Sequence, residues 1–147
     1  DFDEDRWSNM IETNLNGVYR CVRAVLPGMI SRKKGSIIIV SSMWGQVGAS
    51  CEVAYSTAKA GLIGMTKALA KEEGPSGIRV NCICPGLIDT EMNAEVSKEA
   101  QEDIIYDTPL SRIGTPADVV KVMKFLASDQ SGFVTGQVMG VNGGLIM

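Results

Sequence analysis

The chain has 147 residues, 45% of them hydrophobic and 21% charged, which is typical of one globular domain. A net charge of -3 argues against nucleic acid as the main partner, and no apolar run approaches the ~20 residues of a membrane-spanning helix. The complete absence of histidine excludes a Ser-His-Asp triad and a histidine-based zinc site.

We expect residues 1–147 to form a single partial domain of a longer protein, because Asp1 and its neighbours already resemble the approach to a helix. A natural short product that has lost its Met is the alternative. We expect no signal peptide at the start of the given sequence. The four cysteines lack the paired spacing of a zinc site, and we expect reduced core thiols, no metal and a cytoplasmic location.

A long amphipathic helix is predicted over residues 5–30, where apolar residues recur at helical spacing. One member of this apolar stripe, Asn14, is polar. Arg32, Lys33 and Lys34 follow at its end and form a basic cluster.

The β-branched run SIIIVS at residues 36–41 is typical of a strand that is covered on both faces. Gly45 and Gly48 then mark a loop. A second long helix is predicted over residues 51–73, again from the helical spacing of its apolar residues.

Gly61 and Gly64 are unusual inside that second helix, and close packing against another helix would explain them. Residues 78–84 form the next strand, and the polar stretch at residues 87–112 is a candidate mobile flap over a substrate.

Thr115 is a helix N-cap, followed by a proline and, at the third position, an acid. A last strand is predicted near residues 137–141. The alternation of helices and strands predicts an α/β fold, with a parallel sheet of three strands and helices on both faces.

Tyr55 and Lys59 are four residues apart, so they share one helix face about one turn apart. Ser42 follows a buried parallel strand and Pro85 follows the next one. Ligands bind outside this edge of open α/β sheets. Each residue also has a plainer explanation: a surface pair for Tyr55 and Lys59, helix capping or loop hydrogen bonding for Ser42, and a backbone-bonded core amide for Asn14.

Several motifs taken together resemble the short-chain dehydrogenase/reductase family, of the 3-oxoacyl-[acyl-carrier-protein] reductase type. They are Asn14-Leu15, Ser42 thirteen residues before Tyr55, the YSTAK segment ending at Lys59, IRVNCICPG and VTGQVMGVNGG. The resemblance covers nearly all of the chain. It implies the C-terminal part of a Rossmann-type doubly wound sheet.

The resemblance implies a catalytic tetrad of Asn14, Ser42, Tyr55 and Lys59 for the reduction of a ketone by hydride. Tyr55 would donate a proton, and the cation of Lys59 would favour its phenolate. Ser42 would donate a hydrogen bond to the substrate oxygen. Asn14 would hold a water that links Lys59 to the solvent.

The implied cofactor is NADP, with NAD as the alternative. Asn14, Tyr55 and Lys59 would also bind it, together with the segment that contains Pro85, Gly86, Ile88 and Thr90. The glycine-rich turn that holds a pyrophosphate in this family has no counterpart here, and neither has the residue that distinguishes NAD from NADP. We therefore expect the chain alone to bind dinucleotide poorly and to be inactive.

The resemblance also implies a small-molecule or acyl-thioester ketone as substrate. The basic cluster at Arg32–Lys34 would dock an acidic acyl carrier, or it is simply a solvated helix end; the second basic position expected is Ser76. The stretch around Trp44 and Glu52 is similar to reductases of a 5-aminopentanone modification on elongation factor P. Glu52 would then pair with an amine, or serve as a first-turn acid.

A homo-oligomer, a dimer of dimers, is expected from the resemblance, through the helices at 5–30 and 51–73. A hypothesis of another class is a non-catalytic truncated fragment that only assembles through these two helices. Substitution of Tyr55 by Phe distinguishes the two, because it removes turnover and leaves assembly intact.

Overall fold

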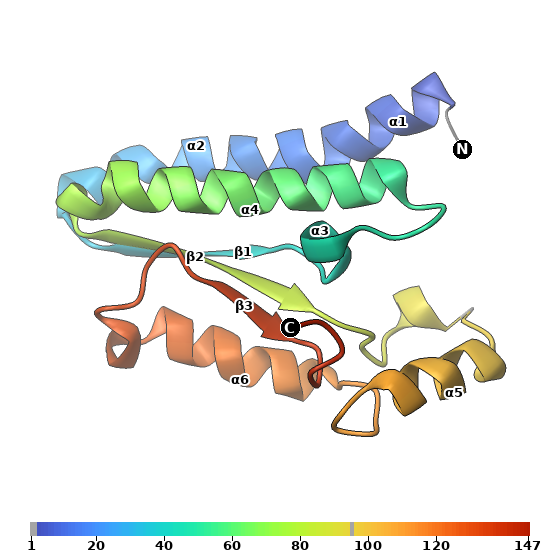
Figure 1. The fold of residues 1–147 in the computed structure, drawn as a ribbon. Coiled ribbons are helices and arrows are strands. Elements are labelled where there is room, and N and C mark those ends of the chain that lie inside the picture. Colours follow the sequence, from blue (N-terminus) through green and yellow to red (C-terminus); the bar gives the residue numbers. More distant parts are fainter. Residues whose placement is uncertain (1–2, 95) are drawn as a thin grey trace.

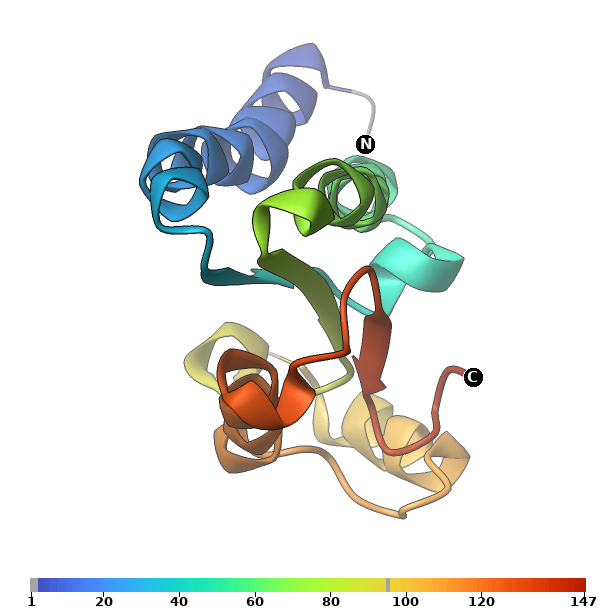
Figure 2. The ribbon, with the colours of Figure 1, turned by 90° about the vertical axis from the view of Figure 1, so that its left-hand side faces the viewer.

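The computed structural model describes residues 3–94 and 96–147 and consists of three layers (Figure 1). The middle layer is a parallel sheet in the order β1-β2-β3, formed by β1 (Gly35–Val40), β2 (Ile78–Pro85) and β3 (Val138–Val141). One face carries α1 (Glu4–Ile11), α2 (Gly17–Arg32) and α4 (Val53–Glu73). The other carries α6 (Pro116–Ala127), with α5 (Lys98–Asp107) beyond its end. The predicted α/β class, with helices on both faces of a three-stranded parallel sheet, is confirmed (Figure 2).

A single helical rod runs from α1 through η1 (Glu12–Asn16) into α2, close to the predicted span of 5–30. Asp3 caps its start by accepting a hydrogen bond of 2.9 Å from the backbone N–H of Arg6. The rod ends at Lys33, whose φ of 51° is left-handed and whose N–H reaches back to the carbonyls of the last turn. The middle segment η1 is a π-helix, which the helical spacing of apolar residues did not predict.

The core lies between β1, β2 and the two long helices. β2 is the central strand, and residues 78–84 are buried except for the half-buried Arg79, as expected for a strand covered on both faces. Leu62 of α4 and Val22 of α2 are buried against it in one cluster that includes Ile39, Val80, Cys82 and Cys84.

Some of the predicted boundaries and environments are wrong. Helix α4 begins at Val53 rather than at 51, because Cys51 has a left-handed φ of 63° that a helix does not accommodate. The predicted loop at Gly45 contains a short helix, α3 (Trp44–Val47). Cys82 and Cys84 are buried thiols as expected, whereas Cys21 and Cys51 are exposed. Short 3-10 turns complete the chain: η2 (Gly74–Ser76), η3 (Glu91–Asn93) and η4 (Asp129–Ser131).

The two helical glycines have different environments. A Cβ on Gly61 would lie 3.1 Å from the methyl carbons of Leu15, so close packing between α4 and the rod explains this glycine. A Cβ on Gly64 would meet nothing within 4 Å, so packing within the chain does not explain that one.

One long edge of the sheet is open. β1 pairs with β2, and among the described residues no strand pairs with its other side. A groove of about 310 Å³ runs along this edge, lined by Val18, Cys21, Val22, Val25 and the strand residues Ile37 to Val40. An apolar strand edge of this kind is a surface on which a further strand can pair.

Asn81 secures the approach to β3. Its side chain is buried in β2, donates to the carbonyl of Val134 at 2.8 Å and accepts from the N–H of Gln137 at 3.1 Å. We expect Asn81→Ala to lower the free energy of unfolding by about 1–3 kcal/mol, because two backbone groups lose their partner. Urea unfolding measures this, with the exposed Gln137→Ala as a control that changes stability by less than about 0.5 kcal/mol. Equal midpoints for the two variants would contradict the assignment.

Candidate active site

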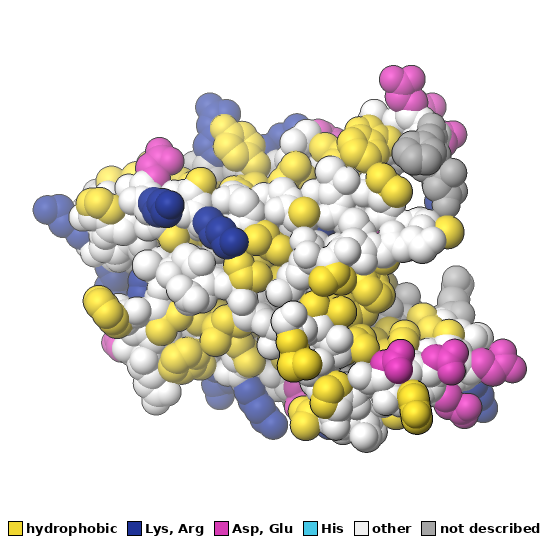
Figure 3. All heavy atoms as spheres, viewed as in Figure 1, with side chains coloured by type: hydrophobic (Ala, Val, Ile, Leu, Met, Phe, Trp, Pro, Cys, Tyr) yellow, Lys and Arg dark blue, Asp and Glu magenta, His cyan; other side chains and the backbone are white. Residues whose placement is uncertain are grey.

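The predicted site residues gather where β1 and β2 end, near the first turns of α4 (Figure 1). Figure 3 shows a notch that opens at this end of the molecule between the α4 layer and α5, with hydrophobic side chains on its floor and acidic side chains along α5. Open parallel sheets bind their ligands outside this edge.

Tyr55 and Lys59 are brought together by the first two turns of α4. The ammonium of Lys59 lies 5.4 Å from the centre of the Tyr55 ring, within the range of a cation–π contact. The same ammonium donates a hydrogen bond of 3.2 Å to the carbonyl of Val40, the last residue of β1. Lys59 is therefore held between the tyrosine and the end of the strand.

The environment of Lys59 weakens its hold on its proton. Burial lowers the pKa of the Lys59 ammonium below its ordinary value of 10.5, and the nearby thiols of Cys82 and Cys84, when ionised, act in the opposite direction. A lysine of this kind is suited to share a proton with a phenol beside it.

Ser42 lies directly after β1 and is 8% exposed. Its hydroxyl accepts a hydrogen bond of 3.2 Å from the N–H of Trp44, in the first turn of α3. A hydroxyl that accepts one bond still has its own proton to donate. This contact is a loop hydrogen bond rather than a helix cap, since α3 has Met43 at its N-cap and no side-chain cap bond, and it is compatible with donation to a ligand.

Asn14 lies inside the π-helical segment of the rod, and π-helical turns are frequent at functional sites. Its amide nitrogen donates within its own helix, to the carbonyl of Met10 at 3.3 Å and to the sulfur of Met10 at 3.0 Å. Of the described contacts of Asn14, none joins it to Lys59. The core-amide interpretation thus describes its bonding, and a link through water to Lys59 stays a prediction.

The second strand end carries the predicted cofactor segment. The carbonyl of Pro85 accepts from the N–H of Met43 at 3.0 Å, which ties this segment to the loop that begins with Ser42. A Cβ on Gly86 would lie 2.8 Å from the Cβ of Asn142, so only glycine fits there. Ile88 is buried, and the hydroxyl of Thr90 donates to its carbonyl at 3.4 Å.

The segment predicted as a flap, residues 87–112, is closed at its base. Contacts of Ile88 and Asp89 with Gly114 form this base, which we call the neck. Ile88 and Gly114 pair in an isolated parallel bridge, with Asp89 N–H donating to the Gly114 carbonyl at 2.9 Å. The segment between contains η3 and α5. The bridge thus joins the start of this segment to a residue just beyond its predicted end, and a flap that acts on a substrate stays a prediction.

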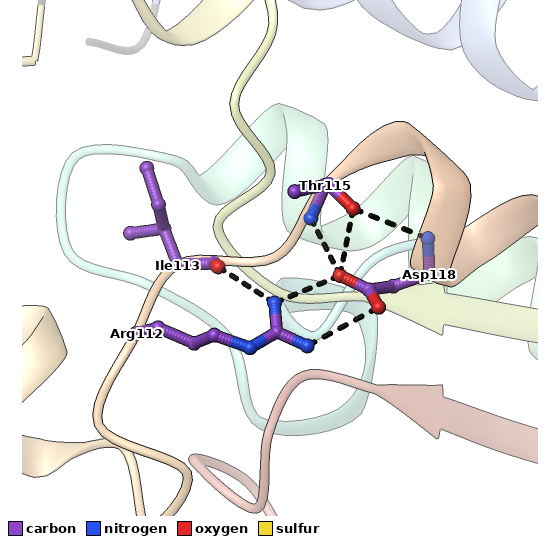
Figure 4. Close-up of polar contacts among 4 residues, drawn as sticks. All are labelled: Arg112, Ile113, Thr115 and Asp118. Carbon is purple, nitrogen blue, oxygen red and sulfur yellow. Dashed lines mark hydrogen bonds and ion pairs between the residues drawn. The ribbon is translucent and has the colours of Figure 1, made fainter.

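An ion pair between Arg112 and Asp118 lies where the chain leaves the flap and enters α6 (Figure 4). Arg112 donates to both carboxylate oxygens of Asp118, at 2.8 and 3.1 Å, and Asp118 also accepts from the N–H of Thr115 in a capping box of α6. The predicted N-cap at Thr115 is confirmed. The hydrogen bonds from Arg112, with those from Thr115, lower the pKa of the Asp118 carboxyl well below its ordinary value of 3.8. The pair therefore persists at neutral pH and is lost only in strong acid.

We expect Arg112→Met to loosen this neck without unfolding the domain, because the pair is exposed and the capping box keeps its own bonds. Hydrogen exchange at the amides of Asp89 and Gly114 should become about 2- to 5-fold faster, as expected for an exposed bidentate pair. The urea midpoint of the whole chain should stay nearly constant. Unchanged exchange at these amides would show that the pair does not hold the neck.

The sequence offered two clues to the substrate, the basic cluster Arg32–Lys34 and the acid Glu52, and only Glu52 lies near Tyr55. Arg32, Lys33 and Lys34 are exposed but end α2 just before β1, whereas Ser42 follows β1. The basic cluster therefore lies at the opposite end of the strands and does not flank this chain's own site. Glu52 is exposed at the N-cap position of α4, three residues before Tyr55, and its side chain makes no capping bond.

The described residues hold neither a metal-binding cluster nor a membrane-spanning helix. No group of three or more acidic or cysteine side chains in them is placed to hold a metal ion. None of the helices in the described part of the chain is long and apolar enough to cross a membrane.

Known proteins match nearly the whole chain. Residues 1–146 match the family model described as Enoyl-(Acyl carrier protein) reductase. The 3-oxoacyl-[acyl-carrier-protein] reductase FabG of Chlamydia muridarum is 44% identical over 142 residues, which make up 97% of this chain and 57% of that protein. The protein called Uncharacterized oxidoreductase YmfI, of Bacillus subtilis, is 42% identical, over 98% of this chain and 60% of its own length. The crystal structure of the 3-oxoacyl-[acyl-carrier protein] reductase of Brucella melitensis matches this chain with a TM-score of 0.95 at 40% sequence identity. The match covers 100% of this chain and 55% of that one.

The parallel sheet with helices on both faces is a Rossmann-type fold, seen over part of its length. The chain belongs to the short-chain dehydrogenase/reductase family, and 3-oxoacyl-carrier-protein reductases are among its relatives. The chain spans between 55% and 60% of the length of the three relatives named above.

Proposed function

We propose that this chain carries the proton-handling half of an NAD(P)H-dependent reductase that converts a ketone of the 3-oxoacyl thioester type into an alcohol. The observation that carries the proposal is the ammonium of Lys59, which lies over the ring of Tyr55 and contacts the end of β1 two residues before Ser42. These three side chains have the functional groups that reduction by hydride requires: a proton donor, a cation and a hydrogen-bond donor.

The chain's own residues account for the movement of the proton. Tyr55 gives its phenolic proton to the substrate oxygen, and the adjacent cation of Lys59 stabilises the phenolate that is left. Ser42 donates a hydrogen bond to the same oxygen and orients the carbonyl. Asn14 and a water then return a proton towards Lys59 from the solvent.

The residues present fit the nicotinamide end of a dinucleotide. The segment Pro85–Thr90 leaves β2 at the edge of the sheet where the ammonium of Lys59 contacts the end of β1. Asn14, Tyr55, Lys59 and the segment Pro85–Thr90 would hold that end. The cofactor would supply the hydride, and NADP is the form we propose, with NAD as the alternative.

The open edge of β1 supports a further part of the proposal. The groove along Ile37 to Val40 fits the side chains of an additional parallel strand, which would bring the phosphate-binding turn with it. Without that strand we expect no appreciable turnover.

We also propose a cytoplasmic location and a homo-oligomer, a dimer of dimers, in which α2 and α4 pack against a second copy. The open space over Gly64 supports that arrangement.

The test uses a chimera in which the N-terminal part of the Chlamydia muridarum reductase, outside the matched region, precedes this chain. The chimera is mixed with NADPH or NADH and an acetoacetyl thioester, and the absorbance of the reduced cofactor is followed. We expect turnover for the chimera and none for the chain alone. A folded chimera that binds the cofactor but reduces no ketone would refute the proposed reaction.

A second candidate substrate is an amino-ketone such as the 5-aminopentanone modification of elongation factor P. The exposed carboxylate of Glu52, one helical turn before Tyr55, is the observation that favours it. Faster reduction of a free aminoketone than of the thioester by the chimera, lost in Glu52→Gln, would support this substrate over the first.

A further inference from the structure

Ser41, the residue before Ser42, makes a contact that the proposed reaction does not use. Its side chain is 3% exposed, and its hydroxyl donates a hydrogen bond of 2.8 Å to the backbone carbonyl of Lys59. A carbonyl inside an α-helix ordinarily accepts from the N–H four residues further on. Here the end of β1 adds a second bond, directed at the residue whose ammonium faces Tyr55.

Both the side chain and the backbone of Lys59 are therefore hydrogen-bonded to the end of β1. Its ammonium donates to the carbonyl of Val40 at 3.2 Å, and its carbonyl accepts from the hydroxyl of Ser41 at 2.8 Å. Val40 and Ser41 are consecutive residues. Two bonds to one strand end leave the lysine little freedom to slide along or away from β1.

Close packing reinforces the same point. A Cβ on Gly45 of α3 would lie 2.7 Å from the Ser41 hydroxyl and 2.8 Å from the carbonyl carbon of Lys59. The backbone of α3 therefore rests on that of α4 at this carbonyl, and neither backbone can give way as a flexible side chain would.

We infer that Ser41 is a positioning residue for Lys59: its hydroxyl fixes the turn of α4 that holds the Lys59 ammonium over Val40 and opposite Tyr55. The catalytic consequence rests on the proposed function, whereas the positioning itself does not. The titratable groups around the ammonium are Tyr55 on its own helix and the thiols of Cys82 and Cys84 on β2.

The direct experiment is a titration of Lys59 in the intact chain. Lysines are dimethylated with ¹³C-formaldehyde, and the Lys59 signal is assigned by its loss in Lys59→Arg. In Ser41→Ala we expect the pKa of Lys59 to rise towards the ordinary lysine value, because a released side chain returns to solvent. Ser41→Cys, similar in size but a weaker donor, should give an intermediate shift and decides the question if the alanine variant does not fold.

Thr66→Ala is the matched control. Thr66 lies on the same helix, is 0% exposed, and its hydroxyl donates to the carbonyl of Leu62 at 2.8 Å. Its loss should lower stability about as much as the loss of Ser41 and leave the Lys59 titration unchanged. A titration in Ser41→Ala identical to that of the unsubstituted chain, or an equal shift in Thr66→Ala, would overturn the inference.

Turnover of the chimera supplies the second readout. At saturating cofactor, Ser41→Ala should lower kcat about 10-fold or more with little change in the KM for the ketone, since a displaced lysine affects the proton step rather than ketone binding. If the chimera has no activity with any ketone, the proposed function fails, and the titration still decides whether Ser41 positions Lys59. A shifted titration together with an unchanged kcat would remove the catalytic consequence.

Discussion

Tyr55→Phe should abolish ketone reduction in the chimera, with a loss of about 10²–10⁴-fold in kcat, because the phenol is the group that gives its proton to the substrate oxygen. The substitution removes one oxygen and keeps the ring over which the Lys59 ammonium lies. Stability and cofactor binding should therefore change little. Initial rates at saturating cofactor, with binding measured separately by fluorescence, give the two quantities.

Tyr19→Phe is the control, since Tyr19 lies on α2 and is 52% exposed. It should retain full turnover. The same pair of variants distinguishes the enzyme from a fragment that only assembles, because assembly should survive both substitutions. A Tyr55→Phe chimera that reduces the ketone as fast as its parent would show that another group donates the proton.

Lys59→Met should remove turnover to a similar extent and at the same time stabilise the fold. The substitution keeps an unbranched side chain of comparable length but takes a charge out of a half-buried position that lowers the pKa of the lysine. Methionine fills such gaps well. Gain of stability with loss of activity is the expected sign of a residue kept for function.

The pH dependence of this gain has a definite sign. The pKa of Lys59 in the folded chain is lower than in the unfolded chain, where it has its ordinary value of 10.5. The unfolded state therefore binds more protons between those two values, and the unsubstituted chain gains stability as pH rises through that window. The advantage of Lys59→Met should be greatest at neutral pH and shrink as pH approaches 10.5. Urea unfolding of both proteins at several pH values measures it, and a variant less stable at neutral pH would contradict the account.

The fold was largely predictable because its elements have strong local signals. Residues 37–40 are all β-branched, and Thr115 with Pro116 and Asp118 specifies a helix start that the structure confirms as a capping box. Parallel strands joined by helices then leave few possible topologies. The order β1-β2-β3 follows from these connections.

Features that depend on tertiary contacts were not predictable. Gly45 indicated a loop, but it lies in α3, and glycine is required there because the Lys59 backbone leaves no room for a Cβ. The π-helical segment at Asn14 has the same apolar spacing as an α-helix over so short a stretch, so the sequence carried no signal for it. Gly61 and Gly64 looked alike, and only Gly61 has a partner within the chain.

The site was predictable where spacing along one helix decides it. Tyr55 and Lys59 had to share a face, and they do. The contribution of Ser41 was hidden, because a serine beside Ser42 gives no indication that its hydroxyl reaches a helix carbonyl 18 residues away. The basic cluster at the end of α2 was linked to the site by resemblance alone, and the length of β1 separates the two.

The central claim is that Tyr55, Lys59 and Ser42 form a working proton-delivery site once the sheet is completed. Single-turnover reduction of an acetoacetyl thioester by the chimera, loaded with NADPH, tests it most directly. We predict that cofactor is consumed and hydroxyacyl product forms in equal amounts, and that Tyr55→Phe binds the cofactor equally well but forms no product. Cofactor-bound chimera that forms product no faster than its Tyr55→Phe variant would contradict the account.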